Sequence, residues 1–203
     1  RHHLGIDLQI NGQDGIWRPH LPPLAEERII TFLGLGVLGT SSGQALRKLG
    51  FSVRGWSRRK KSIHGITCYH GDNGLKGALR GADFVVLLLP DTPETEHTLN
   101  RAALSLLKKG AFVINPGRGT LIEDEALLEA LDSGQIGHAT LDVFRIEPLP
   151  ETHPFWSHPK VTVTSHIAAG TRPACSAPVI AENIWRGENN ESFLHLVDRQ
   201  SGY

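Results

Sequence analysis

Several features that often reveal the class of a protein are scarce or missing in this sequence of 203 residues. It has no methionine and begins with Arg1, so we expect residue 1 not to be the translation start. Its two cysteines, Cys68 and Cys175, lie far apart and lack the spacing of metal ligands. They argue against a disulfide framework and a metal site, and favour reduced thiols in a cytoplasmic protein.

Net charge and long apolar runs are missing as well. The 21 basic and 21 acidic residues cancel, so nothing indicates a general attraction to nucleic acid or to an anionic membrane surface. No apolar run approaches the roughly 18 residues of a membrane span, and no signal peptide opens the chain. We therefore expect neither nucleic acid nor a membrane as a partner, and any anion site must be local.

What the chain does contain is a regular alternation of β-rich runs and helical patterns from Arg28 onward. The predicted strands are 28–33, 51–56, 66–69, 84–89, 111–115, 139–143 and 161–164. The predicted helices are 41–49, 75–80, 101–108, 123–133 and 173–186. Repeated strand–helix units with continuous apolar strands predict an α/β fold of the Rossmann type, a doubly wound parallel sheet covered on both faces.

A glycine-rich turn, Gly34-Leu35-Gly36-Val37-Leu38-Gly39, follows the first predicted strand and leads into a helix. In this setting such glycines bind a dinucleotide: Gly34 permits the tight bend, Gly36 lets backbone approach a pyrophosphate, and Gly39 lets helix pack on strand. The helix N-terminus adds N–H donors and a partial positive charge. A purely structural glycine loop is the alternative, and the flanking strand and helix disfavour it.

The end of the second predicted strand indicates which dinucleotide binds. A site for NAD normally places Asp or Glu there, about 20 residues beyond the glycines, on the ribose 2′-hydroxyl. Here Ser57 and Arg58 occupy that place, with Arg59, Lys60 and Lys61 behind them. A hydroxyl and a planar guanidinium suit a 2′-phosphate, so we predict NADP(H), with NAD(H) less favoured. For Lys60 and Lys61 a solvated basic turn is the simpler interpretation.

Arg118 and His166 each follow a predicted strand, and Asp142 closes the strand of Leu141. Ligands of a doubly wound sheet bind beyond the carboxyl ends of its strands. Reduction of a keto acid needs a cation for the substrate carboxylate and carbonyl, and a proton donor for the alkoxide that hydride arrival creates. Arg118 and His166 meet these needs, and Glu147 is the candidate carboxylate that keeps the histidine charged. Taken singly, each is more often a solvated surface residue, so the prediction depends on the combination.

The chain resembles the D-2-hydroxyacid dehydrogenase family in successive stretches that span most of residues 28–172. Besides the glycine turn, these are Leu88-Leu89-Pro90-Asp91-Thr92-Pro93-Glu94-Thr95, Ile114-Asn115-Pro116-Gly117-Arg118-Gly119, Leu141-Asp142-Val143-Phe144-Arg145-Ile146-Glu147-Pro148-Leu149-Pro150 and Ser165-His166-Ile167-Ala168-Ala169. The resemblance implies that Arg118 binds a 2-keto acid, that His166 is the acid/base and that Glu147 supports it.

The resemblance also implies a homodimer and a set of cofactor contacts. These contacts come from Val37, Leu38, Pro90, Thr95 and Gly117, while Asp142 touches the nicotinamide carboxamide. Trp17 would either enter the pocket of a partner, as a tryptophan does in some relatives, or pack within the dimer.

Two features depart from the family pattern. Ser165 stands where the family usually has proline before the histidine. The substrate lobe of roughly 100 residues is almost wholly missing. We therefore expect an N-terminal arm or linker over 1–27, a dinucleotide-binding domain over 28–172, and a C-terminal helix and tail over 173–203 that would pack on the missing lobe.

Together these observations predict an oxidoreductase that transfers a hydride from NADPH to a small 2-keto acid and gives the D-2-hydroxy acid. Trp56-Ser57-Arg58, the Glu147-Pro148-Leu149-Pro150 turn and residues 197–203 are similar to those of family members that reduce glyoxylate and hydroxypyruvate. A non-catalytic NADP(H)-binding module is an alternative, which the missing lobe favours. A dehydrogenase of the phosphoglycerate or formate type is another, which Arg58 disfavours.

Overall fold

The structure is a computed structural model that describes residues 23–199, so the predictions for most of the arm, including Trp17, lie outside the described residues. Its strands are β1 (Ile29–Leu33), β2 (Ser52–Ser57), β3 (Thr67–His70), β4 (Phe84–Leu87), β5 (Ala111–Asn115), β6 (Ile136–Leu141) and β7 (Val161–Val163). Its helices are α2 (Val37–Lys48), α3 (Gly71–Leu79), α4 (Arg101–Leu106), α5 (Asp124–Asp132) and α6 (Pro173–Glu188), with short 3-10 turns η1 (Ala25–Glu27), η2 (Gly119–Leu121) and η3 (Pro154–Trp156).

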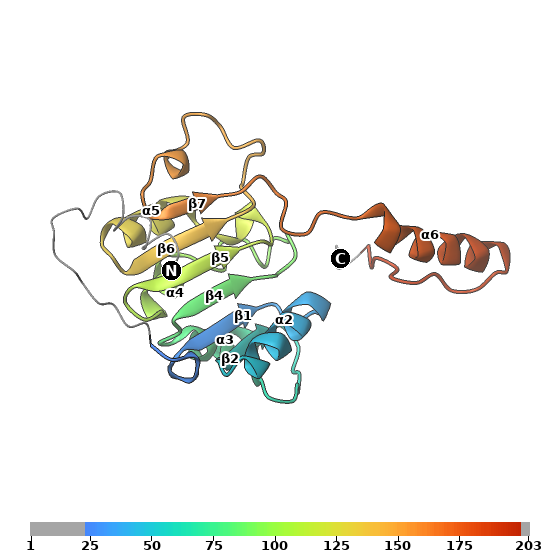
Figure 1. Cartoon of the computed structure of the whole chain (residues 1–203), viewed down its shortest axis with the longest axis horizontal. Helices are drawn as coiled ribbons and strands as arrows, with labels where there is room; N and C mark the ends of the chain where they lie inside the picture. The colour runs from blue at the N-terminus through green and yellow to red at the C-terminus, as the bar shows by residue number, and fades with distance from the viewer. Residues whose placement is uncertain (1–22, 200–203) are drawn as a thin grey trace.

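All seven strands pair in parallel in the order β3-β2-β1-β4-β5-β6-β7. The order reverses between β1 and β4, which is the switch point of a doubly wound sheet. The predicted Rossmann-type fold is therefore confirmed. The carboxyl ends of the strands face the side of the molecule from which the chain leaves β7 towards α6 (Figure 1).

Two apolar cores lie on opposite faces of the sheet. The larger one joins the sheet to α3, α4 and α5 and includes Leu79, Leu104 and Leu127, which are fully or almost fully buried. The smaller one lies under α2, where Phe32 and Val53 pack with their neighbours. Helices therefore cover both faces of the sheet on the side of β1 and β2.

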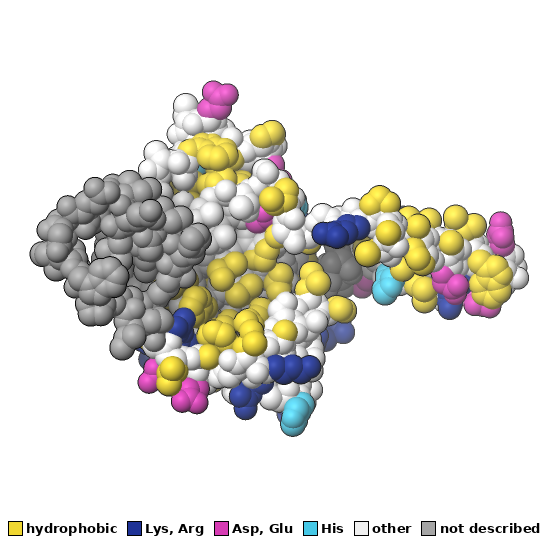
Figure 2. All heavy atoms as spheres, in the orientation of Figure 1, with side chains coloured by type: hydrophobic (Ala, Val, Ile, Leu, Met, Phe, Trp, Pro, Cys, Tyr) yellow, Lys and Arg dark blue, Asp and Glu magenta, His cyan; other side chains and the backbone are white. Residues whose placement is uncertain are grey.

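On the α2 side, the stretch from β4 to β7 has no helix over it among residues 23–199. Phe84 and Phe112 stack there with ring centroids 5.4 Å apart, and Ile114 and His138 continue the row. Pro23 lies at the edge of the same groove, whose volume is about 360 Å³. Figure 2 shows apolar side chains gathered on this face. The expectation of a sheet covered on both faces thus holds only in part for the described residues.

Helix α6 projects away from the sheet (Figure 1), and none of its residues is buried. The chain after it folds back along it, since Asn183 Nδ2 donates to the carbonyl of Leu194 at 3.2 Å and Asn183 Oδ1 accepts from the Leu194 N–H at 2.7 Å. Apolar side chains such as Ile180, Ile184 and Trp185 remain exposed. Within the described residues, no helix is long and apolar enough to cross a membrane.

The first helix begins earlier than the sequence pattern predicts, at Val37 instead of Ser41. Gly39 lies inside it, against the turn that precedes it. A Cβ atom added at Gly39 would lie 2.0 Å from the carbonyl oxygen of Gly34, which no backbone rearrangement within a helix easily accommodates. Glycine here serves close approach of helix and strand, and so its low helix propensity is tolerated.

We expect Gly39→Ala to lower the free energy of unfolding by about 1–3 kcal/mol, because the added methyl group forces the helix off the strand. Gly36→Ala is the matched control, since a Cβ atom there meets nothing within 4 Å. Its cost should stay below about 1 kcal/mol, the scale of replacing glycine by alanine at a helix N-cap. Equal losses in urea unfolding of the two variants would refute the assigned packing role of Gly39.

Candidate active site

The glycines of the turn differ in their surroundings, since some are closely packed and one faces open space. Gly34 has φ +109°, and a Cβ atom on it would lie 2.4 Å from the carbonyl oxygen of Leu88. Gly36, by contrast, faces open space, and Val37 and Leu38 in the first turn of α2 are exposed. Backbone N–H groups at a helix N-terminus can therefore be approached closely by an anion at this turn.

The end of β2 brings the basic segment onto the glycine turn. The Ser57 side chain is buried and its hydroxyl donates to the carbonyl of Arg59 at 2.8 Å. Lys61 Nζ donates to the carbonyl oxygen of Leu35, within the glycine turn. The Lys61 residue is exposed all the same, so its interpretation as part of a solvated basic turn stays a prediction. Arg58 lies close enough to Glu94 for its charge to act on that carboxylate.

Two further turns of the same edge are held by their own side chains. Thr95 Oγ1 donates to the carbonyl of Pro90 at 2.7 Å, which closes the loop after β4. Asn115 is buried at the end of β5; its Oδ1 accepts from the N–H of Gly117 at 3.1 Å and its Nδ2 donates to the carbonyl of Arg118 at 2.9 Å. Asn115 was not among the predicted site residues, although it supports the turn that carries Arg118.

Arg118 itself is exposed beyond β5, and one of its guanidinium nitrogens donates to the carbonyl of Gly117 at 2.7 Å. A Cβ atom at Gly117 would lie 2.8 Å from the carbonyl oxygen of Leu87. The turn before Arg118 therefore packs directly against β4, and this packing fixes the backbone from which the Arg118 side chain extends.

His166 and Glu147 form the pair that the sequence predicts. His166 Nδ1 lies 2.8 Å from Glu147 Oε2, and Glu147 Oε1 accepts from the N–H of Phe144 at 2.9 Å. The hydrogen bond with His166, followed by that from Phe144, holds the pKa of Glu147 below its ordinary value. With Nδ1 engaged by a carboxylate, Nε2 is the ring nitrogen that can present a proton to a ligand.

Asp142 holds the loop on which His166 lies. Its Oδ1 accepts from the hydroxyl of Thr164 and from the N–H of Ile167 at 3.0 Å, and its Oδ2 accepts from the N–H of Ala168 at 2.9 Å. Burial acts to raise the pKa of Asp142, but these hydrogen bonds outweigh it and lower the pKa. The N–H of His166 also donates to the Asp142 carbonyl at 2.8 Å.

His166 needs this support because its φ is +55°, a left-handed conformation that non-glycine residues adopt rarely. Such conformations persist where the surrounding contacts over-determine them. The predicted contact of Asp142 with the nicotinamide carboxamide stays a prediction, whereas its hold on this loop is visible in the geometry.

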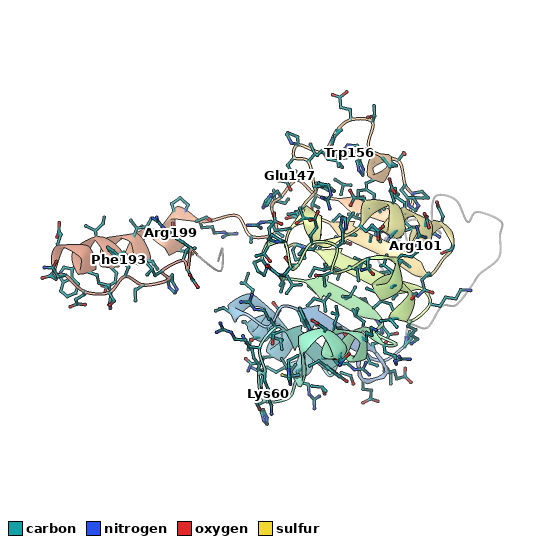
Figure 3. All side chains as sticks on the ribbon, turned by 180° about the vertical axis from the view of Figure 1, so that it is seen from behind. Lys60, Arg101, Glu147, Trp156, Phe193 and Arg199 are labelled. Carbon is teal, nitrogen blue, oxygen red and sulfur yellow. The ribbon has the colours of Figure 1, made fainter. Side chains whose placement is uncertain are left out.

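The structure thus brings Arg118, Glu147 and His166 to the same edge of the sheet as the glycine turn. The charge of Arg118 contributes to lowering the pKa of Glu147, so the two side chains interact electrostatically. A cation, a carboxylate–histidine pair and a turn open to a dinucleotide share one edge. Figure 3 shows Glu147 on the side of the domain from which the chain leaves for α6.

Comparison with known proteins gives the family. Residues 5–168 match the family described as D-isomer specific 2-hydroxyacid dehydrogenase, NAD binding domain. The chain belongs to this dehydrogenase family. The resemblance drawn from its motifs is therefore confirmed.

Curated relatives in this family carry the name glyoxylate/hydroxypyruvate reductase A. The protein from Yersinia enterocolitica is 42% identical over 197 residues, which is 97% of this chain and 63% of that protein. The protein from Serratia proteamaculans is 43% identical, with the same coverage of each chain. The chain thus spans less than two thirds of the length of these relatives.

Solved structures of family members are also similar. A D-isomer specific 2-hydroxyacid dehydrogenase from Xanthobacter autotrophicus, in complex with NADPH and MES, is 42% identical with a TM-score of 0.93, over 100% of this chain and 82% of the other. An NADPH-dependent glyoxylate/hydroxypyruvate reductase from Sinorhizobium meliloti, in complex with NADP and sulfate, is 36% identical with a TM-score of 0.92, over 100% and 64%.

The hold of Asp142 on the His166 loop gives a pH-dependent prediction. Asp142→Asn removes charge-assisted hydrogen bonds and should lower the free energy of unfolding at pH 7 by about 1.5–3 kcal/mol. A lowered carboxylate pKa stabilises the fold above the ordinary value of 3.8, and this contribution is lost as pH falls through the folded pKa. The difference between parent and variant should therefore shrink between about pH 5 and pH 2.

Urea unfolding at pH 7 and at successively lower pH measures this difference. Glu151→Gln serves as a control, because Glu151 is an exposed carboxylate of the same stretch of chain. A parent–variant difference for Asp142→Asn that stays constant with pH would contradict the proposed hold.

Proposed function

We propose that this chain is the cofactor-binding part of an NADPH-dependent reductase that converts a small 2-keto acid, such as glyoxylate or hydroxypyruvate, to the D-2-hydroxy acid. The observation that carries the proposal is the contact of 2.8 Å between His166 Nδ1 and Glu147 Oε2, at the same sheet edge as the glycine turn. The names of the relatives agree with this activity.

NADP(H) fits the residues at the edge of β1 and β2. Gly36 leaves room for a pyrophosphate at the N-terminus of α2, where Gly34, Val37, Leu38 and Gly39 complete the turn. Ser57 and Arg58 would hold the 2′-phosphate, and Pro90, Thr95, Gly117 and Asp142 would line the rest of the cofactor site. When bound, the cofactor supplies the hydride that reduces the keto carbon.

The protein's own groups then bind the acid and supply the proton. The Arg118 guanidinium would hold the substrate carboxylate and stabilise the negative charge that develops on the keto oxygen. His166 would donate the proton from Nε2 to that oxygen, while Glu147 on Nδ1 favours the protonated ring and fixes its orientation. Water exclusion requires a second lobe to close over this edge.

That second lobe and a homodimer partner belong to the proposal. The domain division into 1–27, 28–172 and 173–203 is supported by the exposed apolar side chains of α6, which offer a surface for the lobe. The open face of β4 to β7 offers a further apolar surface for assembly. The free state of Cys68 and Cys175 is consistent with a cytoplasmic protein.

A non-catalytic NADP(H)-binding module is the second candidate, because the open glycine turn at Gly36 can bind the cofactor without help from Arg118, Glu147 or His166. The two candidates differ in one assay. Reduction of glyoxylate by NADPH, followed at the absorbance of the reduced cofactor, is expected for the enzyme and is absent for the module.

The first prediction from this proposal concerns cofactor choice. The chain should bind NADPH more tightly than NADH, and Arg58→Asp should remove much of that preference. A bidentate contact of Arg with phosphate corresponds to roughly 10- to 100-fold in affinity. Lys60→Asp makes the same change of charge on a side chain at the outer tip of the β2 turn (Figure 3) and should have a smaller effect. Equal dissociation constants for the two cofactors by calorimetry would rule out the assignment of Ser57 and Arg58.

The second prediction concerns the proton, in the protein that carries its substrate lobe. His166→Ala should reduce turnover roughly 10²- to 10⁴-fold with little change in NADPH affinity, because only the proton donor is lost. Arg118→Ala should impair both substrate affinity and turnover. Glu147→Gln should be milder. Since it removes the negative charge that favours the protonated ring, reduction should fade at lower pH than in the parent.

Steady-state reduction of glyoxylate across pH tests these variants together. His64→Ala, which removes an exposed histidine at the far end of the β2–β3 connection, should behave like the parent. Near-parental turnover of His166→Ala would overturn the mechanism and leave only cofactor binding.

A further inference from the structure

Arg145 lies two residues before Glu147, and its side chain reaches a different loop of the site. Its Nη1 lies 2.9 Å from Glu96 Oε1, and its Nη2 contacts Nε2 of His97. Glu96 and His97 directly follow Thr95, in the loop between β4 and α4. One guanidinium therefore bridges the loop that carries Glu147 and the loop proposed to contact the cofactor.

The turn that carries Arg118 lies between these two loops and contacts both. A Cβ atom at Gly119 would come within 1.9 Å of the Phe144 carbonyl carbon and 2.2 Å of the Arg145 nitrogen, so the two backbones are in direct contact. On the other side, the N–H of His97 donates to the carbonyl of Thr120 at 2.9 Å. Three loops with three different site residues thus meet at Arg145.

The contact at His97 is specific in its geometry. His97 has φ +52°, a left-handed conformation that is unfavourable for a residue with a Cβ atom. Its N–H is held by Thr120 and its ring by Arg145, so both ends of the residue are fixed. These two contacts fix His97 in its left-handed conformation.

Other charged groups surround the bridge. Asp124 at the start of α5 is partly buried, which raises its pKa, while the neighbouring His153, Arg145 and His97 act in the opposite direction. His153 Nε2 lies 3.7 Å from Asp124 Oδ2. His153, further along the loop that carries Glu147, therefore lies near Asp124, while Arg145 links the near end of this loop to Glu96.

We propose that Arg145 is a positioning residue for the reduction. By joining the Glu147 loop to the loops of Thr95 and Arg118, it keeps the Glu147 carboxylate against His166. The proposal rests on the proposed function for its catalytic meaning, but the bridge acts on the geometry of the pair with or without substrate. Because the Arg145–Glu96 pair is half-exposed, with side-chain exposures of 38% and 48%, its loss should leave the fold intact.

The chain offers a matched control for this bridge. Arg101 and Glu129 form another exposed ion pair between distant parts of the sequence, with exposures of 62% and 56%. Arg101 lies in the helix layer, away from Glu147 (Figure 3). Arg101→Ala therefore removes an equivalent surface ion pair that touches no residue of the site.

The first measurement does not require catalytic activity. In this chain, NMR titration of the His166 ring reports how strongly the Glu147 carboxylate favours the protonated ring. Arg145→Ala should move the titration midpoint in the same direction as Glu147→Gln, to lower pH. Arg145→Lys keeps the charge but loses the two-pronged contact, so it should fall between Arg145→Ala and the parent. Glu96→Ala should move the midpoint in the same direction by less, and Arg101→Ala should leave it unchanged.

The second measurement uses the protein with its substrate lobe. Arg145→Ala should lower kcat for glyoxylate about tenfold, since small misplacement of a catalytic group has effects of this order or larger. KM and the NADPH dissociation constant should change much less. In the Glu147→Gln background, Arg145→Ala should add no further shift of the pH profile, because both changes act through the same pair.

The outcomes separate this proposal from the proposed function. A parental His166 titration in Arg145→Ala overturns the positioning role, whether or not the protein reduces glyoxylate. So does a shift that adds fully to that of Glu147→Gln. A parent that does not reduce glyoxylate but whose His166 titration responds to Arg145→Ala overturns the proposed function and supports the bridge.

Discussion

Parallel pairing of the seven strands is the constraint on which the rest of this structure depends. Because all strands run in one direction, every segment that follows a strand emerges at one edge of the sheet. Residues more than 130 positions apart, Gly34 and His166 among them, are brought to that edge by the sheet and not by contacts of their own. The local hydrogen bonds then need only to fix the conformation of each loop at that edge.

Those local bonds come mainly from buried polar side chains at the ends of strands. Asn115 fixes the turn after β5, and Asp142 fixes the loop after β7 from its place after β6. A buried carboxylate is unfavourable without partners, and Asp142 has three donors. The same bonds that satisfy Asp142 hold His166 in its left-handed conformation, so stability and the geometry of the site rest on one side chain.

Much of this could be predicted from the sequence, because apolar runs and glycine turns act locally. All seven strands and the glycine turn were predicted in this way. The Glu147–His166 pair was predicted from the chemistry that keto-acid reduction requires, and the structure shows the contact. The start of α2 at Val37 was not predicted, because glycine has a low helix propensity and Gly39 therefore suggests a later start. Position 39 is glycine because the helix packs closely against Gly34 there. The Lys61 contact was missed because a run of basic residues carries no sign of which ammonium folds back onto Leu35.

The open sheet face could not be predicted, since apolar periodicity shows that a face is to be covered but not by what. The exposed apolar side chains of α6 are in line with the expectation that this helix packs on the missing lobe, which stays a prediction. Helix α6 follows an exposed connection, and Gly170 within it would accept a Cβ atom with nothing within 4 Å. At 1.5 Å per residue the 16 residues of α6 form a rod about 24 Å long. As a lever, it would carry its far end through about 4 Å for a rotation of about 10° at this connection. A small rotation in the connection that follows His166 would therefore displace the exposed apolar side chains at the far end of α6.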